Sequence, residues 1–180
     1  MGDSVSVLEA VRRVRELRTG GPTPPTELLA ALMVIEDAVQ AIGAYQALSR
    51  FTTAGDAYLS KFGLLQALQL GFDAAEKVGR TLGVRLRADR EPGGKTVLVT
   101  RNLVAGHPIG GTFNSQRWNH FHDRQTAQSK EVIRVMSFHA ADSDIWTGQT
   151  VVVAQLISDG LDVIAGLLNR AVESGPKEGP

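Results

Sequence analysis

The chain has 180 residues, no cysteine, and 19 basic against 19 acidic residues, so its formal net charge at pH 7 is zero. Without cysteine it can form neither a disulfide nor a thiolate metal site, and we expect a reducing, cytoplasmic setting. A neutral chain has no overall attraction for nucleic acid, so such a partner would need a local basic patch. The sequence has no signal-peptide pattern and no unbroken apolar run of about 18 residues, which predicts no membrane association.

Three helices are predicted in the first half of the chain, where apolar residues recur at steps of three and four. The first covers residues 4–18, the second 26–50 and the third 56–82. Short turns rich in glycine, proline and threonine separate them. Long amphipathic helices joined by short turns favour antiparallel neighbours in a bundle.

The second half of the chain changes from helix to strand and back. A short helix is predicted over 95–105, although Val97-Leu98-Val99 also has strand character. Alternating residues at 117–122 and β-branched residues at 131–138 predict an antiparallel hairpin. Asp142-Ser143-Asp144 predicts a turn, and a last helix follows from about 150 to 173, with an entry that is alternatively extended.

These elements predict a mainly α fold, an antiparallel up-and-down helical bundle with a small β-hairpin inserted before the last helix. We expect one domain over residues 1–180. Its parts are an N-terminal helix and linker (1–25), bundle helices (26–108), a hairpin insert (109–149), a last helix (150–173) and a tail (174–180).

The strongest functional candidate lies where the bundle helices end. Arg101, Asn102 and His107 place a permanent cation, a carboxamide and a titratable imidazole in one short segment. A guanidinium suits phosphate oxygens and a histidine exchanges a proton near neutral pH. Together they meet the needs of RNA cleavage by the ribose 2′-hydroxyl, without a metal or cofactor.

The same residues also have a purely structural interpretation. Gly106 and Pro108 are typical of a helix end, where a histidine is favourable to the helix dipole. On an uninterrupted helix, side chains six positions apart point about 120° apart. Arg101 and His107 would therefore need a helix end between them, or complements from a second subunit, to form one site.

Residues 101–108 (Arg-Asn-Leu-Val-Ala-Gly-His-Pro) resemble the R-x(4–6)-H signature of HEPN domains, with a polar residue directly after the arginine. The order of long helices before the motif and one helix after it is also similar, and the resemblance extends over 26–172. It implies a homodimeric bundle whose two motifs face one cleft, acting as a metal-independent endoribonuclease in toxin–antitoxin, phage-defence or RNA-processing systems. Arg101 and His107 then take the catalytic positions, with Asn102 as the polar residue beside the arginine.

The resemblance leaves an alternative, because many HEPN members are inactive. In that case the chain is a non-catalytic helical module that binds a protein partner, such as an antitoxin, or nucleic acid.

The predicted hairpin carries two further hypotheses. His120 and His122 share a face of a strand and form a weak candidate metal pair without a placed third ligand. Alternatively, Arg117, Trp118, Phe121 and Arg124 form an RNA platform that stacks bases and neutralises phosphates. Surface histidines and partly buried aromatic residues are the plainer interpretations of the same pattern.

Overall fold

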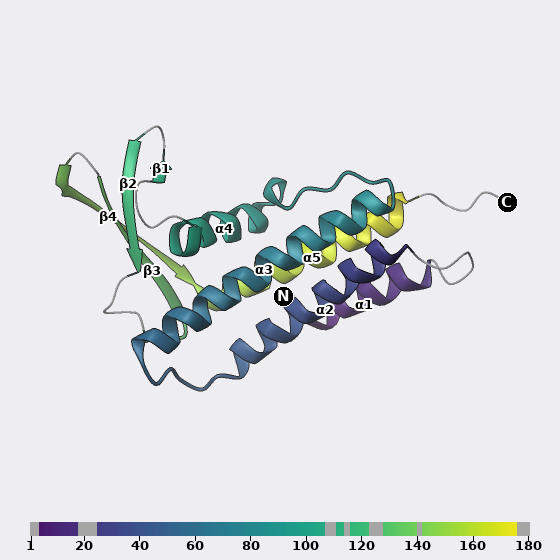
Figure 1. Cartoon of the computed structure of the whole chain (residues 1–180), viewed down its shortest axis with the longest axis horizontal. Coiled ribbons are helices and arrows are strands. Elements are labelled where there is room, and N and C mark those ends of the chain that lie inside the picture. The colour runs from purple at the N-terminus through teal and green to yellow at the C-terminus, as the bar shows by residue number, and fades with distance from the viewer. Residues whose placement is uncertain are drawn as a thin grey trace.

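The computed structural model describes residues 4–17, 25–106, 111–113, 116–122, 128–139 and 142–175. Within these residues the chain forms five α-helices and a four-stranded sheet (Figure 1). The helices are α1 (Ser4–Glu16), α2 (Thr26–Ala47), α3 (Ala54–Thr81), α4 (Pro92–Arg101) and α5 (Val153–Ser174). A 3₁₀ turn, η1 (Ala88–Arg90), precedes α4 and a π-helical turn, η2 (Asn102–Gly106), follows it. The strands are β1 (Gly111–Phe113), β2 (Gln116–His122), β3 (Val132–His139) and β4 (Asp142–Val152).

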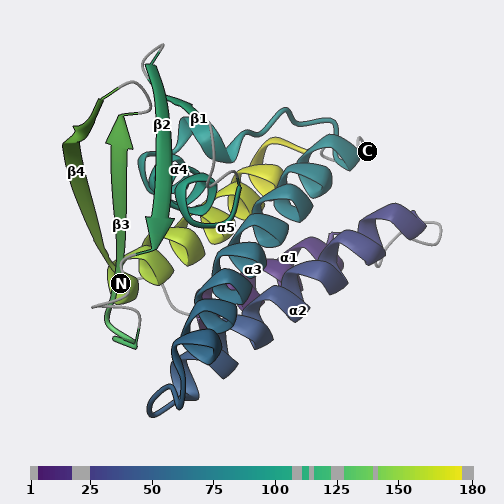
Figure 2. The same ribbon diagram turned by 60° about the vertical axis from the view of Figure 1, so that its left-hand side comes forward.

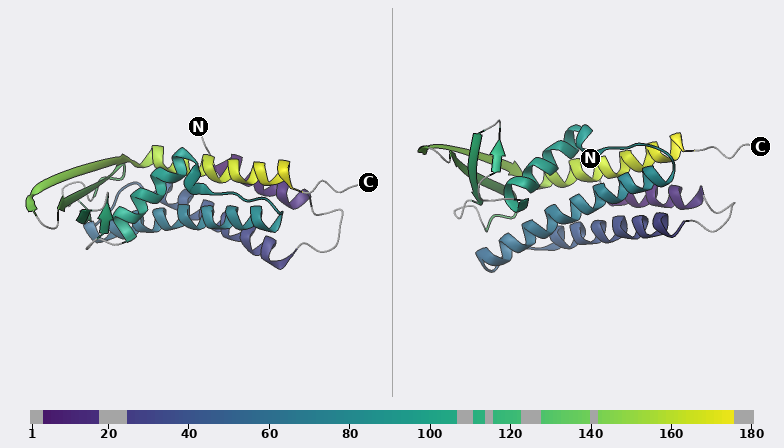
Figure 3. Two further views of the ribbon diagram at one scale, coloured as in Figure 1. Left: turned by 90° about the horizontal axis from the view of Figure 1, so that it is seen from above. Right: turned by 45° about the horizontal axis from the view of Figure 1, so that its top comes forward.

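The long helices lie side by side and confirm the predicted helical bundle. α2 packs against α3, α3 against α5, and α5 against α1, while the shorter α4 rests on α3 and α5 (Figures 1 and 3). Two polar contacts fix α1 on its neighbours, from Arg13 to Asn169 on α5 and from Arg15 to Glu36 on α2. The predicted fold class is therefore confirmed.

Local sequence sets both ends of α3. At its start the Thr53 hydroxyl accepts a hydrogen bond from the Asp56 amide, and the Asp56 carboxylate accepts one from the Thr53 amide. This capping box satisfies two amides that the first helical turn leaves without partners. At its end Gly83 adopts a φ of 76°, and the amides of Gly83 and Val84 bond the carbonyls of Arg80 and Gly79. That pairing is a Schellman motif, which ends the helix.

The contact between α3 and α5 is close because each helix offers a glycine to the other. A methyl group at Gly71 would lie 2.6 Å from a terminal carbon of Ile164, and one at Gly160 would lie 2.5 Å from a terminal carbon of Leu68. Leu68 and Ile164 are fully buried. Each of these side chains thus packs against the backbone of the opposite helix, which gives the close packing typical of protein interiors.

The sheet stands at one end of the bundle, beside α4 and α5 (Figure 2). Its order is β1-β2-β3-β4 and all pairings are antiparallel. The predicted hairpin forms its centre, with Trp118 opposite His139 and His122 opposite Val135. The turn expected at 142–144 is wrong, because these residues begin β4, which pairs with β3 and extends to Val152. Ile133, Val135 and Ser137 alternate along β3 and are buried, so one face of this strand is covered.

Helix α2 has a mean hydropathy of 1.5 over an 18-residue window, and among the described residues it is the one helix long and apolar enough to cross a membrane. Length and composition alone do not separate such a segment from a helix in a protein core. Eight of its residues are buried, and its stripe of large apolar side chains packs in the bundle core. Packing against α3 thus accounts for much of its apolar composition.

Candidate functional site

The end of α4 places Arg101 and Asn102 where the helix changes its hydrogen-bonding pattern. Arg101 is the last residue of α4, and Asn102 opens the π-helical turn η2. The Asn102 amide bonds the carbonyls of Leu98 and Val99, so the backbone passes from one pattern to the other without a break. Such π-helical turns are rare and frequently occur at functional sites.

The Arg101 side chain is partly held in place. One terminal nitrogen, Nη1, donates to Asn102 Oδ1 over 3.1 Å. Its Nε is buried and has no partner among the described residues, and neither has the Oγ1 of the adjacent, buried Thr100. Native structures satisfy most buried polar groups, so unsatisfied ones call for an explanation. A guanidinium has five N–H donors and the bond to Asn102 uses one of them, so this group can also bind acceptor oxygens such as those of a phosphate.

His107 lies outside the described residues, as do Pro108 and Arg124. The relation between Arg101 and His107 therefore stays a prediction. The expected angle of about 120° between the Arg101 and His107 side chains assumes an uninterrupted α-helix. Because residues 102–106 form a π-helical turn, that angle does not describe this segment.

The sheet comes close to the candidate site, since β2 packs against the π-helical turn. Arg117, Trp118 and Phe121 lie on β2, and their roles in RNA contact stay predictions. The register places His120 opposite Ser137 and His122 opposite Val135. Among the side chains that the structure describes, no group of three or more histidine, aspartate or glutamate residues is arranged to hold a metal ion. The side chains of His120 and His122 are not among them, so the weak metal hypothesis at this pair stays a prediction.

A second polar region lies where the sheet meets the bundle, and sequence patterns did not reveal it. We call it the joint, formed by Tyr45, Phe51, Lys61, Lys130 and Glu131. The Lys130 ammonium bonds the carbonyls of Gln46, over 2.7 Å, and Leu48. A cation is favourable there because the carboxyl end of α2 carries partial negative charge. The Tyr45 hydroxyl donates to the Lys130 carbonyl over 3.1 Å, which ties α2 to the start of β3.

Burial changes the acid–base properties of the joint. Lys61 is fully buried, with its ammonium 5.9 Å from the centre of the Phe51 ring. Burial lowers the pKa of Lys61 to about 8, and the negative charge of Glu131 opposes this change. Burial also raises the pKa of Tyr45 to about 12, with a smaller contribution from Glu131. A hydrogen bond from Ser129 is the main reason why the pKa of Glu131 is lowered, so this carboxylate is ionised at neutral pH.

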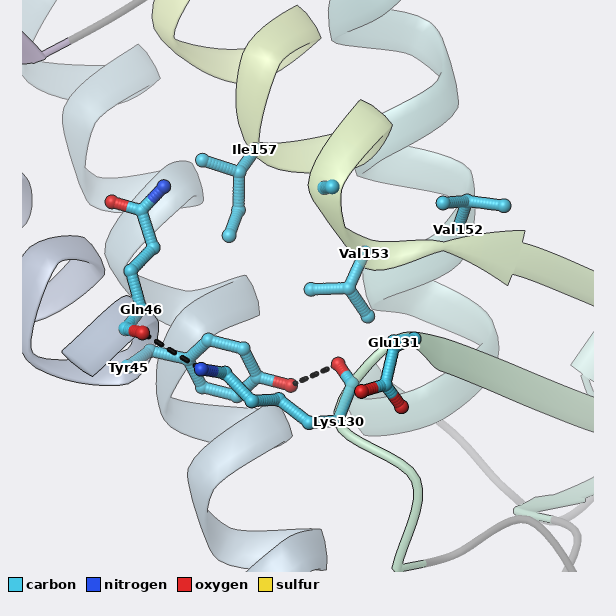
Figure 4. Close-up of a pocket in the computed structure, with 8 residues that line it drawn as sticks. Tyr45, Gln46, Lys130, Glu131, Val152, Val153 and Ile157 are labelled. Carbon is cyan, nitrogen blue, oxygen red and sulfur yellow. Dashed lines mark hydrogen bonds between the residues drawn. The ribbon is translucent and has the colours of Figure 1, made fainter. Parts of the chain in front are cut away.

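A hollow of about 480 Å³ opens beside the joint (Figure 4). It lies between the carboxyl end of α2, the start of β3 and the junction of β4 with α5. Its lining consists of Tyr45, Gln46, Lys130, Glu131, Val152, Val153, Ala154 and Ile157. These residues come from three segments that are far apart in the sequence and meet only in the folded protein.

No family model, curated protein or solved structure matches this chain. The resemblance to HEPN domains therefore stays a prediction that depends on the motif at 101–108 and on the order of the helices.

Proposed function

We propose that the chain is a metal-independent endoribonuclease of the HEPN type. The observation that carries the proposal is Arg101, a cation at a helix end that donates to Asn102 and whose Nε has no partner in the part of the chain that the structure describes. Arginine binds phosphate oxygens through several N–H groups in a fixed plane, which makes this residue a suitable clamp for an RNA phosphate. The substrate is RNA because the reaction uses its 2′-hydroxyl as the nucleophile.

In the proposed reaction the 2′-oxygen attacks the adjacent phosphorus and the bond to the 5′-oxygen breaks. The 2′-hydroxyl loses its proton to a base, and the departing 5′-oxygen gains one from an acid. His107 serves as acid or base, since an imidazole exchanges protons near neutral pH. Arg101 stabilises the negative charge that develops on the phosphorane, and Asn102 orients the guanidinium. The products are a 2′,3′-cyclic phosphate and a 5′-hydroxyl.

We further propose that two copies of the chain form the working enzyme. A two-fold axis would bring Arg101 and His107 of both copies to one cleft, as the resemblance to HEPN domains implies. The proximity of β2 to the π-helical turn supports a role for Arg117, Trp118 and Phe121 in holding RNA beside the cleft. A cytoplasmic ribonuclease of this kind needs restraint, which favours an antitoxin partner in a toxin–antitoxin or phage-defence setting.

The test is cleavage of a labelled RNA by the purified protein in the presence of a chelator. We expect cyclic-phosphate products from the natural chain and at least a hundredfold loss of rate in His107→Ala and Arg101→Ala, following the usual size of general acid–base and charge-stabilising contributions. Arg90→Ala is the control, because Arg90 is an exposed arginine just before α4. Full activity in folded His107→Ala protein would contradict the assignment.

A second candidate function is a non-catalytic helical module that binds a protein partner. Leu29, Met33 and Val34 favour it, because these large apolar side chains are exposed on α2. Exposed apolar surface at helical spacing suits a partner helix. Stable co-purification of one defined protein, weakened by Met33→Glu and combined with no RNA cleavage, would favour this function over the first.

A further inference from the structure

The hollow beside the joint has the size and lining of a small-molecule site. Its volume of about 480 Å³ falls within the range of roughly 300–1,000 Å³ typical of ligand pockets. The apolar side of the hollow consists mainly of Val152 and Ala154, which are exposed, because Tyr45, Val153 and Ile157 also line it but are at most 4% exposed. Val152 is 53% exposed at the same hollow, which leaves a large apolar side chain in contact with water. An apolar molecule in the hollow would cover it.

Most polar groups around the hollow already have partners within the protein. The Lys130 ammonium is bound to two backbone carbonyls at the end of α2, and the Tyr45 hydroxyl donates to the Lys130 carbonyl. Neither group needs a ligand. The Glu131 carboxylate is exposed, its Oε2 accepts a hydrogen bond from Ser129 at 2.8 Å, and the backbone amides of Lys130 and Glu131 are further donors to it. A carboxylate has about four acceptor positions, so it retains capacity for a further donor.

The position of Glu131 makes it the natural contact for a polar head group. Glu131 lines the hollow together with Tyr45 and Val153 (Figure 4), so its carboxylate borders the same space as Val152 and Ala154. A ligand whose apolar body fills the hollow can therefore present one donor to this carboxylate. The charges of Lys61 and Lys130 also interact with Glu131, so the test compares a neutral, a cationic and an anionic head group.

We propose that this hollow binds a small molecule with an apolar body and one hydrogen-bond-donating head group, an alcohol or a primary amine. The body contacts Val152 and Ala154, and the head group donates to Glu131. The site shares no residue with the Arg101 segment. The proposed binding site and the proposed ribonuclease activity can therefore be tested independently of each other.

The experiment is an NMR titration of the whole chain with three probes of equal length, 1-hexanol, hexylamine and hexanoate. We expect saturable shifts of the amides at 152–157 with 1-hexanol and hexylamine at millimolar concentrations, and at least fivefold weaker binding of hexanoate. Ala154→Phe should abolish binding, because Ala154 is exposed and lines the hollow. Gln155→Phe is the matched control, since the adjacent residue is exposed but is not part of the lining.

Glu131→Gln tests the head-group contact separately from the apolar body. We expect it to weaken the binding of hexylamine at least fivefold, because an ion pair becomes a neutral contact. The binding of 1-hexanol should change by less than twofold. Failure of all three probes to bind the natural chain would overturn the site. Hexanoate binding as strongly as hexylamine, or hexylamine binding unaffected by Glu131→Gln, would overturn the role of Glu131.

Discussion

The contact between α3 and α5 and the joint beside the sheet hold the molecule together in different ways. Between α3 and α5, Leu68 and Ile164 pack onto glycine backbone, and both are fully buried. At the joint, a buried lysine, a tyrosine hydroxyl and an exposed carboxylate make contacts between separate elements. Apolar packing depends on shape and hardly on pH, whereas contacts among ionisable groups depend on both. The bundle should therefore respond to changes of volume, and the joint to changes of charge.

The largest effect is expected from Leu68→Ala in the α3–α5 contact. Leu68 is fully buried against Gly160, so its truncation leaves a cavity, and we expect a loss of about 2–5 kcal/mol in the free energy of unfolding. Leu70→Ala is the control on the same helix, because Leu70 is 52% exposed. Its expected effect is within about 0.5 kcal/mol. Urea denaturation of both variants measures the difference, and equal losses would show that this contact is not close-packed.

Adding side-chain volume at a close backbone contact of α4 should also destabilise the protein. A methyl group at Gly94 would overlap the Ala88 carbonyl oxygen, a backbone atom that cannot rotate away. We expect Gly94→Ala to lower the free energy of unfolding by about 1–3 kcal/mol. Gly63→Ala is the matched control in α3, where nothing lies within 4 Å of the added carbon. There the change should stabilise the helix by about 0.5–1 kcal/mol. Thermal unfolding would contradict the close contact if both variants were stabilised.

The bundle and the joint also differ in how far sequence predicts them. Apolar periodicity predicted the long helices to within a few residues of their ends, because their buried stripes follow the helical repeat. β4 was missed, since its polar start carries no alternating pattern and its order comes from pairing with β3. Lys61 sits four residues from both Ala57 and Leu65 on a buried stripe, but a charged residue suggests a surface position.

The candidate site was predictable only in part. The sequence predicted a helix over 95–105 that ends at Gly106, whereas α4 ends at Arg101 and the π-helical turn continues from Asn102 to Gly106. The π-helical turn and the direct hydrogen bond between Arg101 and Asn102 depend on local packing, which no residue pattern encodes. The hollow at the joint was beyond prediction for a different reason. Its lining comes from three segments far apart in the chain, and none of them carries a recognisable motif.

The prediction that best separates the joint from the bundle is a change of stability with pH. Burial lowers the pKa of Lys61 from 10.5 to about 8 in the folded protein. Between these values the unfolded chain binds the proton and the folded chain has released it, so stability should rise with pH across this window. One pKa unit corresponds to about 1.4 kcal/mol, so we expect a gain of up to about 3 kcal/mol from this group between pH 8 and pH 10.5. Lys61→Met should remove the gain, because it keeps the long side chain without the charge.

The measurement is the free energy of unfolding of both proteins in urea from pH 7.5 to pH 10, compared as a difference. The comparison matters because the raised pKa of Tyr45 acts in the opposite direction. Because the pKa of Tyr45 is higher in the folded state, this residue lowers the stability of the protein as pH rises above the ordinary tyrosine pKa of about 10. Tyr45 is present in both proteins, so its effect cancels and the difference reports Lys61. A difference that stays constant from pH 8 to pH 10 would mean that Lys61 keeps its ordinary pKa. The joint would then be no more sensitive to pH than the apolar contact between α3 and α5.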